Sequence, residues 1–258
     1  MTEFINSLVA SSVTTFIMHP FDVIRTQYQL NILNMRSNPI TLLKNVLKNQ
    51  GIFGLYKGTT SHLLTYPIFW AIFFQIKKGS IEFTNHQILN NISNSLLAST
   101  LASTIANPLF VLKIRKQSEI LRGCPNINYI NLIKMISKNE GISGFFKGLK
   151  ITVFGNIKLG LQFPMYDFFL EKTNQNILIS SSFSKLIVSS LFYPLDIIRT
   201  HQRDATYQLP AKVIAQKILR TNGIKGFYRG LIYHNLTSAP NFILLMLIKD
   251  YLENKNYC

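Results

Sequence analysis

The sequence is poor in acidic residues, in cysteine and in charge overall, and each shortage excludes a class of protein. Only 11 of the 258 residues are Asp or Glu, against 27 Lys and Arg, which gives a net charge of +16. Charged residues make up 15% of the chain, below the roughly 25% of a soluble domain. The two cysteines, Cys124 and Cys258, fit neither a disulfide framework nor a zinc site. A large positive excess on an apolar chain indicates a membrane protein or a nucleic-acid binder.

Targeting and catalytic signals are also missing. The first residues, MTEFINSLVASS, have no basic region before an apolar core, so we expect neither a secretory signal nor an arginine-rich presequence. The sequence shows no catalytic triad, metal-ligand cluster or phosphate-cradling glycine-rich loop. We therefore expect no enzymatic activity, no metal and no cofactor.

What the chain does have is an internal repeat, which should be identified before any fold is assigned. A proline motif occurs three times, as HPFDVIRTQYQ, NPLFVLKIRKQ and YPLDIIRTHQR, and its prolines are 88 and 86 residues apart. A glycine motif follows each copy, as GIFGLYKG (51–58), GISGFFKG (141–148) and GIKGFYRG (223–230). We therefore divide the chain into units 1–84, 85–174 and 175–258, which form one integrated domain.

Each unit contains two long apolar segments separated by a shorter amphipathic one. The first segments span about 4–30, 88–118 and 177–202, and the second span about 59–79, 149–172 and 231–252. The amphipathic pieces, such as NYINLIKMISKNE, have apolar residues at helical spacing and lysines opposite, as surface helices do. None of the long segments is an unbroken run of ~20 apolar residues. Hydropathy alone thus allows a soluble helical repeat or a bundle around a water-filled cavity.

The placement of the basic residues favours the membrane bundle. Segments 25–57, 113–150 and 199–229 hold 20 of the 27 Lys and Arg but only three acids, Glu119, Glu140 and Asp204. All three segments would lie on one side of a six-span bundle, which is the positive-inside bias. The sequence therefore predicts an all-α membrane protein with six transmembrane helices in three pseudosymmetric repeats, and with short surface helices on the side that carries the basic residues.

With these features, the sequence resembles the mitochondrial carrier family over essentially its whole length. Members have three repeats, each with Pro-x-Asp/Glu-x-x-Lys/Arg on an odd-numbered helix, then an acid-Gly pair and an aromatic-Lys/Arg-Gly triplet. This chain departs from the pattern at three positions: Gln50 and Asn222 replace the acid before glycine, and Phe110 replaces the second motif acid. NPLFVLKIR, MHPFDVIR, FWAIFF (69–74) and FGNIKLGLQFPMYD (154–167) are most similar to the branch that carries folate, FAD, NAD and pyrimidine nucleotides.

The resemblance implies a gate on the matrix side. Because an internal proline removes a helical hydrogen bond, we expect kinks at Pro20, Pro108 and Pro194, below which the odd helices converge. The resemblance implies that Asp22 pairs with Lys113 and that Asp196 pairs with Arg25. Arg199 would face Phe110 in a cation–π contact, and Gln29 and Gln117 would brace the ion pairs. A static set of interhelical ion pairs is the alternative interpretation.

The glycine motifs resemble the cardiolipin-binding positions of the family. Glycines here end the surface helices and open the even helices, whose free N–H groups favour phosphate; they also make turns. The positions are Gly51, Lys57, Gly58, Gly141, Lys147, Gly148, Gly223, Arg229 and Gly230.

The family pattern also implies where a solute is contacted, at one level of the even helices. Phe154 would stack on a base or flavin ring, and Lys158 would meet a phosphate or carboxylate. For His62 and His234 a satisfied polar residue near a helix start is an equal alternative. The expected contacts are His62, Leu64, Thr65, Phe154, Gly155, Lys158, His234 and Thr237.

These expectations define a multi-pass carrier of the mitochondrial inner membrane, or of a mitochondrion-derived organelle, with both termini facing the intermembrane space. It would be a monomer that moves a small anionic solute by alternating access, with FAD, folate or NAD favoured. Alternative cargoes are pyrimidine or adenine nucleotides, thiamine pyrophosphate and S-adenosylmethionine. A non-transporting membrane scaffold of the same fold is the rival from another class. A nucleic-acid partner is not expected, because it would leave the six apolar segments without a role.

Overall fold

The computed structural model describes residues 2–30, 39–79, 87–122, 127–204, 209–228 and 230–255. The first third of the chain forms α1 (Thr2–Leu30), α2 (Pro39–Gln50), η2 (Ile52–Tyr56) and α3 (Thr59–Lys78). The middle third forms α4 (Gln87–Arg122), α5 (Tyr129–Glu140), η3 (Ile142–Phe146), α6 (Leu149–Gly155) and α7 (Ile157–Lys172). The last third forms α8 (Ile177–Arg203), α9 (Ala211–Asn222), η4 (Ile224–Tyr228) and α10 (Leu231–Lys255). Each third therefore has a long helix, a short helix and a 3-10 turn, followed by a second long span that is divided into α6 and α7 in the middle third.

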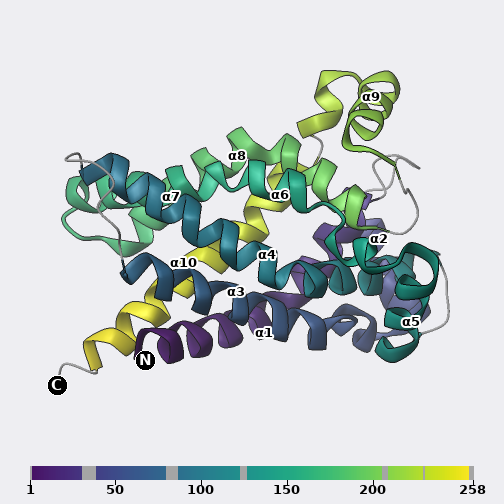
Figure 1. Ribbon diagram of the computed structural model, residues 1–258, viewed down its shortest axis with the longest axis horizontal. Coiled ribbons are helices and arrows are strands. Elements are labelled where there is room, and N and C mark those ends of the chain that lie inside the picture. The colour runs from purple at the N-terminus through teal and green to yellow at the C-terminus, as the bar shows by residue number, and fades with distance from the viewer. Residues whose placement is uncertain are drawn as a thin grey trace.

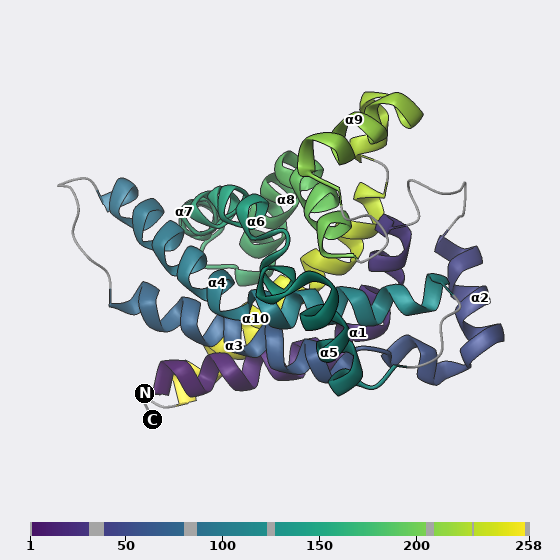
Figure 2. The same cartoon turned by 45° about the vertical axis from the view of Figure 1, so that its right-hand side comes forward.

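The long helices close into a ring. We call α1, α4 and α8, the first long helix of each third, the odd helices, and α3, α6–α7 and α10, the second, the even helices. Neighbours along the chain pack against each other, and α10 returns to pack against α1. The short helices α2, α5 and α9 lie at one end of the ring, called here the short-helix end, and the start of α1 lies at the other end (Figure 1 and Figure 2). Because the ring is closed, its interior is bounded by side chains from all three thirds of the chain.

Within the part of the chain that the structure describes, three stretches are long and apolar enough to cross a membrane: Leu89–Glu119, Ile177–Arg203 and Ile224–Leu252. The first two lie on α4 and α8, and the third covers η4 and most of α10. The expected helix over 149–172 is interrupted, because α6 ends at Gly155 and α7 begins at Ile157. Asn156 at this break donates from its side-chain amide to Ser103 Oγ at 3.0 Å, which fixes the break against α4.

The predicted proline positions lie inside helices, as Pro20 in α1, Pro108 in α4 and Pro194 in α8. Each proline removes one backbone hydrogen bond and so marks a point where its helix can bend. The predicted unit boundary at 84/85 lies outside the described residues, and the one at 174/175 falls in the short connection between α7 and α8. The described prolines and ring closure together bring the second halves of α1, α4 and α8 to the short-helix end.

Candidate functional site

A cavity of about 170 Å³ lies inside the ring. The proline-motif carboxylates Asp22 and Asp196 line it, and both are buried, with 5% and 4% of their surface exposed. Buried carboxylates need partners, because removing an unpaired charge from water is costly. The partners of these two groups define the geometry of the site.

Asp22 binds a cation from the next third of the chain. Its Oδ2 lies 2.7 Å from Nζ of Lys113 on α4, and its Oδ1 lies 3.3 Å from Arg25 on its own helix. The side-chain amide of Gln117 donates to the same Oδ2 at 3.1 Å. The structure therefore brings together Asp22 and Lys113 as the sequence indicated, with Gln117 at the bracing position.

Asp196 differs from the expectation. Its carboxylate lies 2.7 Å from Nζ of Lys158 on α7 and 2.7 Å from Arg199 one turn along its own helix. Arg25, the expected partner, is held by Asp22 instead. The physical reason is reach, because α7 packs directly against α8 and the lysine side chain extends down to the carboxylate. We call the buried ion pairs around Asp22 and Asp196 the ion-pair ring. Lys158, expected as a solute contact, thus belongs to this ring as well.

Phe110 also meets a different cation from the one expected. The guanidinium of Arg203, rather than Arg199, lies over its ring, 4.6 Å from the centroid. Arg203 also donates to Asn107 Oδ1 at 2.9 Å and to Thr152 Oγ1 at 3.0 Å. Arg199 is unavailable because Asp196 holds it. The expected brace Gln29 instead accepts a hydrogen bond from Thr200 Oγ1 at 3.3 Å.

The expected solute contacts divide into two groups. His62, Lys158 and His234 line the cavity. Leu64 and Phe154 do not line the cavity, and their side chains are 51% and 60% exposed. The other three expected contacts are Thr65, Gly155 and Thr237, and they are not among the residues that line the cavity.

The positions of the side chains around α3 explain why His62 lines the cavity while Leu64 and Thr65 do not. The cavity-facing residues of α3 are at 62, 66, 69 and 70, which share one side of a helix, whereas 64 and 65 point elsewhere.

The sequence analysis named His234 but missed the other two members of a row of polar residues on α10, Ser238 and Asn241. His234, Ser238 and Asn241 line the cavity and follow a helical i, i+4, i+7 spacing. His234 Nδ1, Ser238 Oγ and Asn241 Oδ1 are buried and have no hydrogen-bond partner among the described residues. Buried polar atoms are normally paired. This row therefore presents free hydrogen-bonding groups to whatever occupies the cavity, and its spacing on an apolar helix is the signal that could have revealed it.

Away from the short-helix end, the even helices meet through aromatic rings. Phe163 of α7 stacks on Phe73 of α3 with centroids 5.0 Å apart, and it contacts Phe242 of α10 at 6.1 Å. Trp70 of α3 lies 6.4 Å from Phe242. Each pair of even helices is thereby joined, and these residues belong to one buried apolar cluster. We call Trp70, Phe73, Phe163 and Phe242 the aromatic cluster.

One group of side chains has the composition of a metal site. Ligand atoms of His19, Asp22 and His62 lie within 4.8 Å of one another. The Nδ1 atoms of the two histidines are 3.0 Å apart, and His19 Nε2 lies 3.3 Å from the Lys57 carbonyl. Because a carbonyl only accepts, this contact requires a proton on Nε2, so Nδ1 of neutral His19 accepts from His62. The Lys113 ammonium on Asp22 disfavours a further cation, and we assign no metal.

The glycines of the aromatic-basic-Gly triplets are points of close contact between thirds of the chain. Their φ angles of +85°, +76° and +91° favour glycine. A Cβ atom would lie 2.7–3.3 Å from a side chain of the following third, the last being followed by the first. The pairs are Gly58 with Gln117, Gly148 with Arg203, and Gly230 with Tyr28.

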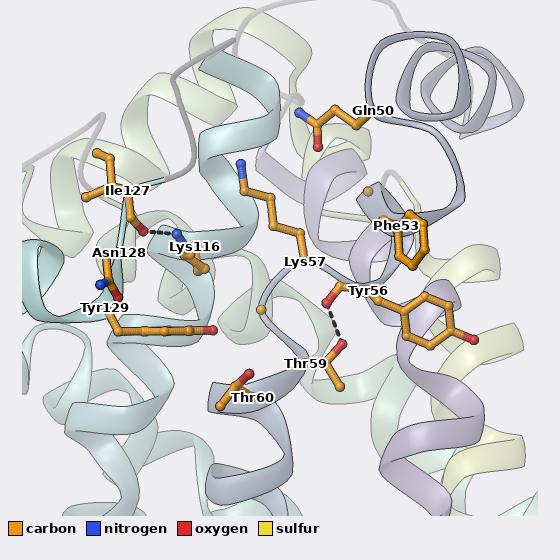
Figure 3. A pocket seen from close by; sticks show the side chains of 12 residues that line it. Gln50, Phe53, Tyr56, Lys57, Thr59, Thr60, Lys116, Ile127, Asn128 and Tyr129 are labelled. Atoms are coloured by element: carbon orange, nitrogen blue, oxygen red, sulfur yellow. Dashed lines mark hydrogen bonds between the residues drawn. The ribbon is translucent and has the colours of Figure 1, made fainter.

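A second pocket, of about 690 Å³, opens at the short-helix end between the first and second thirds of the chain. Figure 3 shows Lys57 and Lys116 on its two sides, with the start of α3 at Thr59 and the start of α5 at Tyr129. Both lysines also contact Glu119 at 3.2 Å. Two helix N-termini and two ammonium groups make this pocket suitable for an anion.

The remaining predicted lipid positions lie at equivalent places. Gly51, Gly141 and Gly223 follow α2, α5 and α9 with φ angles of +65°, +66° and +63°. Arg229 lies outside the described residues. Lys147 bonds Glu140 at 2.7 Å, and Arg115 bonds the same oxygen at 2.7 Å. Burial opposes ionisation of Glu140, but the hydrogen bonds from Arg115 and Lys147 prevail and lower its pKa below its ordinary value.

Comparison with known protein sequences, which does not depend on the geometry described above, finds similarity to carrier proteins over nearly the whole chain. The sequence model of the family described as "Mitochondrial carrier protein" matches residues 1–87, 84–176 and 171–256. Mitochondrial substrate carrier family protein M of Dictyostelium discoideum is 28% identical over 98% of this chain and 95% of its own. The chloroplastic nicotinamide adenine dinucleotide transporter 1 of Arabidopsis thaliana is 28% identical over 87% of this chain and 82% of its own. The mitochondrial FAD carrier of Saccharomyces cerevisiae is 22% identical over 98% and 96%.

Proposed function

Because the chain belongs to the mitochondrial carrier family, we propose that it moves an anionic cofactor or nucleotide, with FAD, folate or NAD favoured, by alternating access. The expected family and fold class are confirmed: the chain is an all-α membrane protein of three repeats. Members of this family are transporters and not enzymes, so the chain is a solute transporter. Its cargo and mechanism are the subject of the proposal.

The charge of the cavity wall carries the proposal. Six cationic side chains line the cavity against two carboxylates, Asp22 and Asp196. Since charge held away from water needs compensation, this excess favours an anionic solute. The six are Arg25, Lys113, Lys158, Lys185, Arg199 and Arg203.

The remaining wall fits a solute with a ring and polar groups. Tyr66, Trp70 and Phe110 provide aromatic surface on one side of the cavity, and Ser238 and Asn241 provide free polar atoms on another. Aromatic surface stacks on bases and flavins, and the polar row supplies hydrogen bonds that fix orientation. Relatives named as NAD and FAD transporters agree with a cargo of this kind.

The ion-pair ring would act as the matrix-side gate. Buried ion pairs add little net stability, because desolvation offsets their attraction. A solute that offers replacement contacts can therefore open the ring at small cost, while the aromatic cluster closes the other end. The present cavity, about 170 Å³, is below the roughly 300–1,000 Å³ of ligand pockets, which is consistent with a closed state between the two gates.

A binding screen tests the cargo. Thermal unfolding of the purified chain in cardiolipin-containing detergent would be followed with FAD, NAD, folates, purine and pyrimidine nucleotides, thiamine pyrophosphate and S-adenosylmethionine. A ligand that binds the folded state raises its stability, so we expect selective stabilisation by one class, followed by uptake of that compound into liposomes. Cooperative unfolding with no shift for any compound would favour a different cargo or the non-transporting scaffold.

The membrane and lipid assignments extend the proposal. Relatives are mitochondrial and chloroplastic proteins, and the basic short-helix end would face the matrix of a mitochondrial inner membrane, with both termini on the other side. The pocket of Figure 3 would hold a phosphate of cardiolipin against Lys57 and Lys116.

Cardiolipin should therefore raise the melting temperature more than phosphatidylcholine does, and Lys57→Gln should reduce that difference. The surface variant Lys212→Gln is the control. An equal cardiolipin effect in Lys57→Gln and the wild type would contradict the lipid assignment.

A further inference from the structure

Lys185 is the cavity cation that the ion-pair ring leaves unused. It lines the cavity from α8 and is half-buried. Among the described residues it makes no ion pair and no hydrogen bond, and its ammonium lies 5.2 Å from the centroid of the Phe242 ring. The other five cavity cations each have a polar partner, in Asp22, Asp196, or the Asn107 and Thr152 side chains. Lys185 therefore presents a half-buried charge to the cavity without a described polar partner, and an anion in the cavity would supply one.

Lys158 lies near Lys185 on the neighbouring helix. The amide of Gln162 on α7 donates to Ser184 on α8 at 3.1 Å, which fixes the register of the two helices. Lys185 directly follows Ser184, and Lys158 precedes Gln162 by four residues. With a rise of about 1.5 Å per residue, the backbone positions of the two lysines lie within about one helical turn of each other along the helix axes. Both ammonium groups can therefore reach one anion in the cavity.

We propose that a phosphate group of the solute binds between Lys185 and Lys158 and draws Lys158 away from Asp196. This inference rests on the proposed anionic cargo and adds a position and a consequence to it. Lys185 sits on an odd helix, outside the level of the even helices where contacts were expected. Phosphate suits the site, because ammonium groups hold it through charge-assisted hydrogen bonds.

The consequence is a direct link from binding to the gate. Lys158 bonds both oxygens of Asp196, at 2.7 and 3.0 Å. When the phosphate takes Lys158, Asp196 keeps Arg199 on its own helix, with His234 of α10 3.9 Å away. The ion pair between α7 and α8 is then lost, and the ring of ion pairs is weakened at Asp196. A solute without the anion would bind without releasing it.

The experiment compares phosphorylated and dephosphorylated forms of one ligand. FMN and riboflavin differ by one phosphate, as do nicotinamide mononucleotide and nicotinamide riboside, and FAD and NAD are the corresponding complete cofactors. Their affinities would be measured by thermal shift for the wild type, Lys185→Gln, Lys185→Met and Lys185→Arg. Lys77→Gln is the matched control, because Lys77 also lies over a ring of the aromatic cluster, 3.8 Å from the Phe163 centroid, but does not line the cavity.

We expect the wild type to prefer the phosphorylated form, and Lys185→Gln to bind that form about tenfold to a hundredfold more weakly while riboflavin-type binding stays the same. Lys185→Arg should retain the preference, and Lys77→Gln should match the wild type. Lys185→Met gives the same test if the Gln variant does not unfold cooperatively.

The outcomes separate this inference from the proposed function. A wild-type preference for phosphate that survives in Lys185→Gln and Lys185→Met would overturn the Lys185 site and leave the anionic cargo intact. A wild type that binds none of the phosphorylated compounds would overturn the proposed cargo and this site with it. A preference lost in both neutral variants and kept in Lys185→Arg would support the site.

Discussion

Asp22 and Asp196 occupy the same place in the first and third proline motifs, yet they bind different kinds of partner. Asp22 binds Lys113, which comes from the motif of the next repeat. Asp196 binds Lys158, which lies on α7 and outside the repeated proline and glycine motifs. The surroundings are otherwise alike, since His62 and His234, each four residues after a triplet glycine, lie 3.8 and 3.9 Å from the respective carboxylates.

The difference shows that a repeated motif fixes where a carboxylate lies but not which cation reaches it. At Asp22 the pair joins two odd helices and is almost fully enclosed. At Asp196 the cation comes from an even helix and stays accessible from the cavity, with 19% of its side chain exposed against 7% for Lys113. We call the contacts of Asp22, Asp196 and Phe110 the first, second and third arms of the ring. The first arm is suited to holding the ring together, and the second is suited to responding to a ligand.

Replacing Asp22 should have the largest effect on stability. In Asp22→Asn the enclosed Lys113 would lose its carboxylate, and breaking a buried pair in this way costs about 3–5 kcal/mol. We expect a large drop in the thermal unfolding temperature in detergent and loss of liposome transport. The double variant Asp22→Asn with Lys113→Met should recover much of the stability, because no enclosed charge is left unpaired and Arg25, 23% exposed, remains in contact with water. Unfolding of Asp22→Asn at the wild-type temperature would contradict the assigned role.

Replacing Asp196 should have a smaller effect. Lys158 and Arg199 are 19% and 22% exposed, so water can compensate them in part, and the loss is that of hydrogen bonds to a charged group, about 1.5–3 kcal/mol. Asp196→Asn should thus unfold between Asp22→Asn and the wild type in the same assay. Equal destabilisation by the two variants would remove the distinction between the arms.

The third arm has no carboxylate and should be the weakest. Phe110→Leu removes the ring under Arg203 but leaves the hydrogen bonds to Asn107 and Thr152, so the cost is that of the cation–π contact, about 0.5–2 kcal/mol. Phe21→Leu, at a residue 58% exposed beside Pro20, controls for the change of side chain. A wild-type melting temperature for Phe110→Leu would mean that the contact contributes no stability.

Acidification should produce the smallest effect, outside the gate at Glu140. Its pKa is lowered in the folded state, so its contribution to stability is complete above its ordinary pKa of 4.5 and is lost as the pH falls through the lower folded value. Because the desolvation of Glu140 offsets much of what the contacts with Arg115 and Lys147 contribute, we expect at most about 1 kcal/mol.

Thermal unfolding between pH 7 and pH 3 would compare the wild type with Glu140→Gln. This variant resembles the natural Gln50 of the first repeat and should lack this part of the pH dependence. Identical profiles for the two proteins would contradict the assignment.

The sequence predicts the parts of the molecule that repeat. Three motifs at near-constant spacing were enough to place the long and short helices and to group the basic residues at one end, and the family resemblance implied the pair of Asp22 with Lys113. Each of these features depends on backbone position, which the repeat specifies. The internal prolines were placed inside helices for the same reason.

The parts that break the symmetry could not be predicted. Lys158 reaches Asp196 by the length of its side chain, and Arg203 displaces Arg199 over Phe110 because Arg199 is already engaged. The cavity face of α3 was missed because the helix is apolar on most sides, so no amphipathic stripe marks which residues point inward. The break at Gly155 and Asn156 contains no proline that would signal it.

The three glycine contacts run in a cycle, from the first repeat to the second, the second to the third, and the third to the first. No contact depends on which repeat is synthesised first, and α1 already packs against α10. A circularly permuted chain that starts at the second repeat and ends with the first would keep all three contacts. Cooperative thermal unfolding of such a permuted protein would show that the ring has a direction but no beginning.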